Sequence, residues 1–324
     1  MKISLWKPIY RCVGLSVLGM ALFSAARTNA AQRAYPPWSA GRNNPAENKG
    51  YVFEVPEVDN VPDLHGNPGD AGLVLFIAGN QFMVLPRLVE AFEAEHPELK
   101  GKIYYETLPP GILLHQMENH NTLTLGNLTL TVRPDVFEAG ARRVAPLAAQ
   151  GKVGNVVRYA TNDLAIMVRK GNPKHIRSLR DLGRLDVRVS MPNPEWEGVA
   201  RLIEQSIRKA GGDSLVRQIM VAKRQQGTTF LTHIHHRQTP MRIVQGLSDA
   251  GVTWQSEVKF QERIGNPISG VEIPARDNTT GIYAAGVLAD APHREAAEEW
   301  VEFLRSTTAQ SIYRSFGFGI PEQK

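Results

Sequence analysis

The sequence predicts an α/β protein built from two blocks of alternating strands and helices. In the first block, the apolar run LVLFIAG has the length of a buried strand, and in the following MVLPRLVEAFEAEHPEL the residues Leu85, Leu88 and Phe92 recur at helical spacing. A second block of the same kind begins at YATNDLAIMVRKGNP. Strands that alternate with helices indicate largely parallel sheets, and 324 residues with 42% hydrophobic content suffice for two cored domains.

Residues 1–30 are predicted to be a secretory signal peptide. The basic start MKISLWKPIYR precedes the apolar run CVGLSVLGMALFS, and small residues follow it, so cleavage is expected after Ala30. The apolar run is shorter than the roughly 20 residues that a membrane-spanning helix needs. We therefore expect the mature protein to be exported and soluble, without insertion in a membrane.

Loss of this segment changes the charge and the thiol content of the chain. Four basic residues and no acidic residue leave with it, so the formal charge falls from +5 to about +1. The basic surface that a nucleic-acid partner would require is then missing. Cys12 is the one cysteine of the sequence and leaves as well, which excludes disulfides and thiolate metal ligands in the mature protein.

Residues 31–70 are rich in Pro, Asn and Gly and are predicted to be an irregular arm with one strand-like island, Tyr51 to Val55. Asp59, Asp63 and His65 could form a metal pocket in this arm. We interpret them instead as a solvated polar turn.

In the first block, KIYYETL and RPDVFEAG are further strands, and GILLHQMEN is a helix start. Ligands of such sheets bind beyond the carboxyl ends of the strands. This rule places Asn80, Gln81, Pro110, Gly111 and Asp135 near any binding crevice.

In the second block, the strand DVRVSMP is followed by a helix that should begin at Asn193–Pro194 and end at Gly211. A shorter helix should begin at Thr239–Pro240 and end at Gly246. Asp249 to Trp254 is a predicted strand.

At this point the sequence resembles the molybdate-type solute-binding proteins of bacterial ABC importers, which have the two-lobed type II periplasmic binding protein fold. The resemblance runs from about Leu73 to Pro321, and its motifs are LVLFIAGNQFMVLPRLVEAFEAEHPEL, RPDVFEAG, YATNDLAIMVRKGNP, GLSDAGVTWQSE and LADAPHREAAEEWVEFLRSTTAQSIYRSFGFGIP.

The resemblance implies two lobes, each a mainly parallel sheet flanked by helices, joined by two crossover strands near 158–164 and 270–283. Lobe 1 would comprise residues 71–158 plus 271–324, and lobe 2 would comprise residues 159–270. It also implies a periplasmic monomer that delivers a small anionic ligand to an ABC permease and needs no cofactor.

The family's ligand is a tetrahedral oxyanion held by hydroxyls and backbone amides of loops that pass from strand to helix. Asn80 and Pro110 stand where the family usually has serines, and Trp254 stands where it has a tyrosine, so other anions are also expected. The predicted ligand-binding residues are Asn80, Gln81, Gly111, Asn193, His235, His236, Arg237, Thr239 and Trp254.

The stretch TFLTHIHHRQTPMRIVQG allows three interpretations. Arg237 suits bidentate contact to a carboxylate, sulfonate or phosphonate, with His235 and His236 assisting as imidazolium groups. Alternatively, His115, His120, His235 and His236 bind zinc, copper or nickel. Adjacent histidines on an extended chain also face opposite ways, so either one could be merely packed or solvated.

Glu195 and Glu197 could contribute to such a metal site, but we interpret them as partners of a helix macrodipole, because acids are common in a first helical turn. Catalytic motifs such as Gly-x-Ser-x-Gly or His-Glu-x-x-His are missing from the sequence, which argues against an enzyme. The arm at 31–70 leaves open a periplasmic accessory protein that delivers its ligand to a partner enzyme.

Overall fold

The computed structural model describes residues 53–54, 62–125, 128–195, 197–232 and 235–322. The predicted signal peptide with Cys12, most of the predicted arm and His233 lie outside these residues. Among the described residues, every helix is too short or too polar to span a membrane.

The chain forms, up to its first passage between the sheets, the elements β1 (Phe53–Glu54), β2 (Pro62–His65), η1 (Pro68–Asp70), β3 (Leu73–Ile77), η2 (Gly79–Gln81), α2 (Leu85–Glu95), η3 (Pro97–Leu99), β4 (Ile103–Glu106), α3 (Pro110–Glu118), β5 (Thr122–Leu125), β6 (Leu128–Thr131), β7 (Val136–Gly140), α4 (Ala141–Ala149) and β8 (Val153–Asn162).

It continues with β9 (Leu164–Arg169), η4 (Leu179–Gly183), β10 (Val189–Met191), α5 (Val199–Arg217), η5 (Gln218–Ala222), α6 (Lys223–Gln225), β11 (Thr229–Leu231), α7 (Gln238–Val244), β12 (Ala250–Trp254), α8 (Gln255–Arg263), β13 (Ile268–Glu272), β14 (Gly281–Leu288), α9 (Arg294–Phe303) and α10 (Thr307–Ser315).

The strands form two larger sheets, which confirms the predicted α/β class. Among the described residues, the first sheet has the order β1-β2-β4-β3-β7-β14-β8 and the second the order β11-β10-β12-β9-β13. The parallel pairs are β3 with β4 and β7 within the first sheet, and β10 with β11 and β12 at one end of the second sheet. The prediction of mainly parallel sheets is therefore too simple, because strands next to the passages between the sheets pair antiparallel.

The chain passes from one sheet to the other twice. The first passage lies between β8, which ends at Asn162, and β9, which begins at Leu164. The second lies between β13, which ends at Glu272, and β14, which begins at Gly281. Both fall near the predicted crossovers, while the predicted lobe boundaries stay a prediction.

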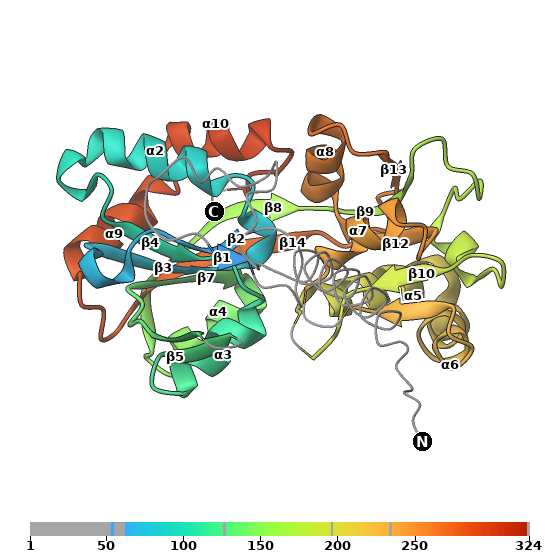
Figure 1. The fold of residues 1–324 in the computed structure, drawn as a ribbon, viewed down its shortest axis with the longest axis horizontal. Helices are drawn as coiled ribbons and strands as arrows, with labels where there is room; N and C mark the ends of the chain where they lie inside the picture. The colour runs from blue at the N-terminus through green and yellow to red at the C-terminus, as the bar shows by residue number, and fades with distance from the viewer. Residues whose placement is uncertain (1–52, 55–61, 126–127, 196, 233–234, 323–324) are drawn as a thin grey trace, which may run out of the picture. The chain divides into compact units, whose positions relative to one another are not determined.

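Helices cover both faces of the first sheet (Figure 1). Leu73, Leu75 and Ile77 of β3 share a hydrophobic cluster with side chains of α2, α9 and α10. Val74 and Phe76 point to the other face and cluster with side chains of α3 and α4. The continuous apolar run of β3 follows from this burial on both faces.

The segment predicted as an irregular arm contributes two strands. β1 pairs with β2, and β2 pairs antiparallel with β4 at the edge of the first sheet. Asp63 of β2 is fully buried, and His65 stacks on Tyr105 with 4.4 Å between ring centroids. The interpretation of Asp63 and His65 as a solvated turn is therefore wrong, because strand pairing carries them into the protein.

Two predicted helix starts also differ from the structure. α5 begins at Val199, and Asn193 instead accepts a hydrogen bond from the Glu195 amide at 3.0 Å, which forms a local turn. α7 begins at Gln238, so Pro240 is its third residue rather than its first. The first turn of a helix tolerates proline there, because its amides have no partner within the helix. The predicted helix ends agree better, since the non-helical Gly212 interrupts α5 and Gly246 follows α7 with φ near +72°.

Candidate functional site

Loops from the two sheets meet where His235 lies against Gly79. Gly79 follows β3 of the first sheet, and His235 lies between β11 and α7 of the second. A Cβ added at Gly79 would overlap the His235 Nε2 atom, so the missing side chain provides the space for the imidazole. His235 is 1% exposed.

Arg237 also joins the two loops. Its Nη1 donates to the Gly79 carbonyl at 3.3 Å, and its Nη2 forms an ion pair with Asp63 of β2. The guanidinium lies 5.2 Å from the centroid of the Phe82 ring. Arg237 and Asp63 are both buried, and the positive charge of Arg237 is paired with the carboxylate of Asp63. A role of Arg237 in binding a ligand stays a prediction.

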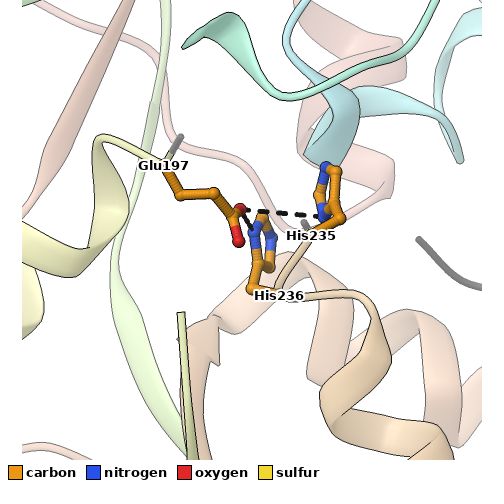
Figure 2. Close-up of side chains that lie close together, drawn as sticks. All are labelled: Glu197, His235 and His236. Carbon is orange, nitrogen blue, oxygen red and sulfur yellow. Dashed lines mark hydrogen bonds and ion pairs between the residues drawn. The ribbon is translucent and has the colours of Figure 1, made fainter. Parts of the chain in front are cut away.

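His236 lies between two buried carboxylates. Its Nδ1 contacts Glu197, which precedes α5, and its Nε2 lies 2.9 Å from Glu257 of α8. Thr253 donates its hydroxyl hydrogen to the other oxygen of Glu257 and fixes that carboxylate. Figure 2 shows Glu197 beside both histidines. The Oε2 atom of Glu197 is 3.7 Å from the Nδ1 atom of His235.

The two histidines have opposite electrostatics. Burial, with the charges of Arg237 and His236, lowers the pKa of His235 well below its usual value, and its Nδ1 accepts a hydrogen bond from the Arg237 amide at 3.1 Å. Burial also disfavours a charged His236, but the charges of and hydrogen bonds to Glu197 and Glu257 together raise its pKa to about 10. One of the three interpretations of this stretch takes both histidines as imidazolium groups, but the pKa is raised for His236 alone and lowered for His235.

Asn80 and Gln81 lie in hydrogen-bond networks of the first sheet. Asn80 donates its amide hydrogen to the Tyr283 hydroxyl at 2.5 Å. Gln81 accepts from the hydroxyls of Tyr159 at 3.0 Å and Tyr313 at 2.9 Å. All of these side chains are buried, so the two residues are held rigidly at the end of β3.

Three further predicted residues lie at the end of the second sheet. The Thr239 hydroxyl lies 2.9 Å from the Ser190 hydroxyl. The backbone amide of Asn193 donates to the Thr232 hydroxyl at 3.2 Å. The ring of Trp254 is 5.7 Å from the ring of Tyr283. Trp254 also covers Gly281, where an added Cβ would lie 2.5 Å from the indole.

The remaining predicted residues do not join this group. Gly111 is the second residue of α3, and His115 and His120 are exposed on and just after that helix. In the described part of the chain, two groups bring three potential metal ligands together, and neither contains His115 or His120. The predicted set of four histidines is therefore corrected to a group of Glu197, His235 and His236.

The sequence analysis missed one residue of the site, Glu257, and gave two others, Glu197 and Asp63, a different role. Glu197 precedes the Gly198 N-cap of α5, so it lies outside the first helical turn in which it was predicted, and its carboxylate pairs with His236. The shift of the α5 start to Val199 explains the error. Asp63 was assigned to a solvated turn because its loop composition hides the strand.

Comparison with known proteins places residues 73–319 in the family described as bacterial extracellular solute-binding proteins. The molybdate-binding protein ModA of Mycobacterium bovis is 23% identical over 257 residues, which cover 78% of this chain and 86% of that protein.

Solved structures show the same fold at low sequence identity. The periplasmic molybdate-binding protein of Azotobacter vinelandii matches with a TM-score of 0.62 and 17% identity over 77% of this chain and 100% of that one. The sulfate-binding protein SubI of Mycobacterium tuberculosis matches with a TM-score of 0.61 and 21% identity over 76% of this chain and 85% of that one.

Proposed function

The chain belongs to the family of bacterial extracellular solute-binding proteins, and on this premise we propose that it captures a small anion for an ABC importer in a cleft between its two lobes. The similar proteins described above are named for binding molybdate and sulfate, both small oxyanions. The proposal extends this ligand class to carboxylates, sulfonates and phosphonates, because a guanidinium lies at the junction of the loops.

The contact between the two strand-end loops carries this proposal. Gly79 of the first sheet meets His235 and Arg237 of the second sheet at one point. Open α/β sheets bind ligands beyond the carboxyl ends of their strands, and here such ends from both sheets converge. A solute bound at this point would contact both lobes and favour their closure.

Arg237 provides the positive charge for an anion in this proposal. A guanidinium carries five N–H donors in a planar fork, so it can serve Asp63 and a solute oxygen together or exchange one for the other. Asp63 competes with the solute for Arg237, since both are anions. The neutral donors nearest in the chain to Gly79 are the buried amides of Asn80 and Gln81.

A periplasmic location, a monomeric state and an ABC permease as partner belong to the same proposal, which is supported by similar proteins that are named as substrate-binding parts of ABC transporters. The alternative is an accessory protein that delivers its ligand to an enzyme. Co-purification of the tagged protein from its own bacterium separates the two: recovery of a permease supports import, and recovery of an enzyme alone supports the accessory role.

The experiment begins with native mass spectrometry of protein purified without added ligand, which reveals a retained anion by its mass. Calorimetry then measures the affinity for molybdate, sulfate, and a simple carboxylate, sulfonate and phosphonate. Arg237→Ala should weaken the binding of the preferred anion by about 2–5 kcal/mol, because the anion loses its opposite charge. Asp63→Asn should strengthen binding, because it removes the competing carboxylate.

Arg242→Ala is the matched control, since Arg242 lies on α7 but stacks on Phe230 at 3.5 Å. Its affinity should equal that of the unmodified protein. Equal affinity in the Arg237 variant, with its fold intact by circular dichroism, would reject the proposed role of Arg237. No binding of any of these anions would reject the anion class.

A further inference from the structure

Glu197, His235 and His236 form a compact buried group at one end of the second sheet. One ligand atom from each of them lies within 4.8 Å of the others, and all three side chains are buried (Figure 2). The centroids of the His235 and His236 rings are 4.3 Å apart, and the rings are tilted by 39°. The Nδ1 atoms of both rings lie next to the carboxylate of Glu197.

The elements that carry this group belong to the second sheet. Glu197 lies in the loop between β10 and α5, and the two histidines lie in the loop between β11 and α7. β11 and β12 are the parallel neighbours of β10, so these loops leave the same edge of the sheet. The three ligand side chains of the group therefore all come from the second sheet, while Gly79 of the first sheet leaves the space for the His235 ring.

Glu197 has unused capacity to bind a cation. Its Oε2 faces the two histidines, whereas its Oε1 is buried and has no hydrogen-bond partner among the described residues. A buried carboxylate oxygen without a partner is costly in free energy. Binding a cation at this oxygen would remove that cost.

Glu257 completes an arrangement that is typical of metal-binding histidines. His236 turns its Nδ1 to Glu197 and its Nε2 to Glu257, 2.9 Å away, while Thr253 holds Glu257 in place. Metal-ligating histidines commonly donate their other ring N–H to a carboxylate, which fixes the tautomer and strengthens the ligand.

We propose that Glu197, His235 and His236 bind one divalent transition-metal ion of the zinc type, with Glu257 as the carboxylate that orients His236. Two imidazoles with one carboxylate suit zinc and its first-row neighbours, and three protein ligands leave a coordination position for water or an anion. The metal ion would displace the proton shared by His236 and Glu197 and would replace the amide hydrogen at the His235 Nδ1 atom.

This metal site goes beyond the proposed anion capture, and each can hold without the other. The metal ligands all come from the second sheet, whereas the proposed anion site lies where Gly79 of the first sheet meets His235 and takes its charge from Arg237. Anion titrations on metal-free protein therefore test the proposed function alone. Zinc titrations without added anion test the metal site alone.

The experiment uses the full mature chain without a polyhistidine tag, stripped with a chelator and dialysed. Calorimetry with zinc should give one ion per chain, and cobalt(II) should give the visible absorption of a four- or five-coordinate ion. Glu197→Gln and His236→Gln should each abolish both signals. Glu257→Gln should lower the zinc affinity by about 10- to 100-fold, as expected for a residue that acts through a ligand.

The partly exposed group of His96, Glu98 and Glu299 provides the matched control. His96→Gln removes a histidine from a similar set of residue types, and it should leave the zinc stoichiometry and the cobalt spectrum unchanged. Circular dichroism and thermal unfolding establish that each variant folds. The proposal is overturned if the unmodified protein binds no zinc, if the cobalt spectrum survives in folded His236→Gln, or if His96→Gln alone removes it.

Discussion

At the scale of single residues, the site is marked by buried charges that pair with one another. Arg237 pairs with Asp63, and His236 pairs with Glu197 and Glu257, all within the protein interior. A buried ion pair adds little net stability, since both charges lose their hydration. Removal of one partner is costly, because the other charge remains buried without compensation.

The Arg237–Asp63 pair permits a double-mutant cycle. Arg237→Ala and Asp63→Ala should each lower the free energy of unfolding by about 3–5 kcal/mol, because each leaves one buried charge behind. The double variant should recover part of this loss, since no uncompensated charge remains. Urea unfolding of the four proteins measures the coupling. Strictly additive losses would mean that the pair does not interact in solution.

The sequence identified one half of each pair. The histidine-rich stretch pointed to residues 235–237 because several chemically active side chains stand together there. Asp63 is 174 positions from Arg237, and Glu197 is 39 positions from His236. Local patterns carry no information on such distant partners, and the Pro- and Gly-rich composition around Asp63 concealed its strand.

At the scale of elements, α7 packs closely on the second sheet and so positions the loop with the two histidines. An added Cβ at Gly251 of β12 would overlap the Thr239 methyl group of α7 and would lie 2.8 Å from the Ser190 carbonyl oxygen. Glycine at this position is therefore required by the close approach of the helix to the strand.

Gly251→Ala should lower the free energy of unfolding by about 1–3 kcal/mol, because α7 must move away from β12 to admit the methyl group. Gly154→Ala is the control, since Gly154 also lies in a strand but an added Cβ would meet nothing within 4 Å. Thermal and urea unfolding measure both variants. Equal stability of the two would show that α7 can shift without cost.

The sequence predicted most of these elements because their burial is periodic or continuous. Residues 73–77 form a strand that is buried along its whole length, as predicted. The predicted helix also buries Leu85, Leu88 and Phe92 in the core. The sequence-based prediction misplaced the starts of α5 and α7. Asn-Pro and Thr-Pro pairs occur in isolated turns as well as in the first turn of a helix. Only tertiary packing decides between these two outcomes.

At the scale of the whole molecule, the first sheet carries two buried glutamates in its interior. Burial raises the pKa of Glu106 to about 7, against hydrogen bonds from Gln116 and Tyr104 that favour its ionised form. Burial likewise raises the pKa of Glu138 to about 7, against hydrogen bonds from Trp300 and Tyr159. Both carboxyl groups keep a proton in the folded protein at pH values where the unfolded chain has lost it.

These raised pKa values give the stability of the folded protein a definite pH dependence. Each glutamate contributes in full below its unfolded pKa of about 4.5, and its contribution is lost as the pH rises through about 7. From pH 4.5 to 7 each group therefore lowers the free energy of unfolding as the pH rises, by about 3 kcal/mol per glutamate at 1.36 kcal/mol for each pKa unit.

Glu106→Gln should remove one such contribution, because the amide retains the acceptor oxygen for Tyr104 and Gln116, at 3.0 and 3.1 Å, but does not ionise. Relative to the unmodified protein, the variant should therefore gain stability steadily between pH 4.5 and 7 and show no further relative change above pH 8. Urea unfolding at half-unit pH intervals measures this difference. Glu90→Gln, on the exposed side of α2, serves as the control at which the same change of residue type lies outside the core. A flat difference for Glu106→Gln would mean that Glu106 is ionised in the folded protein, and that water reaches the interior of the first sheet.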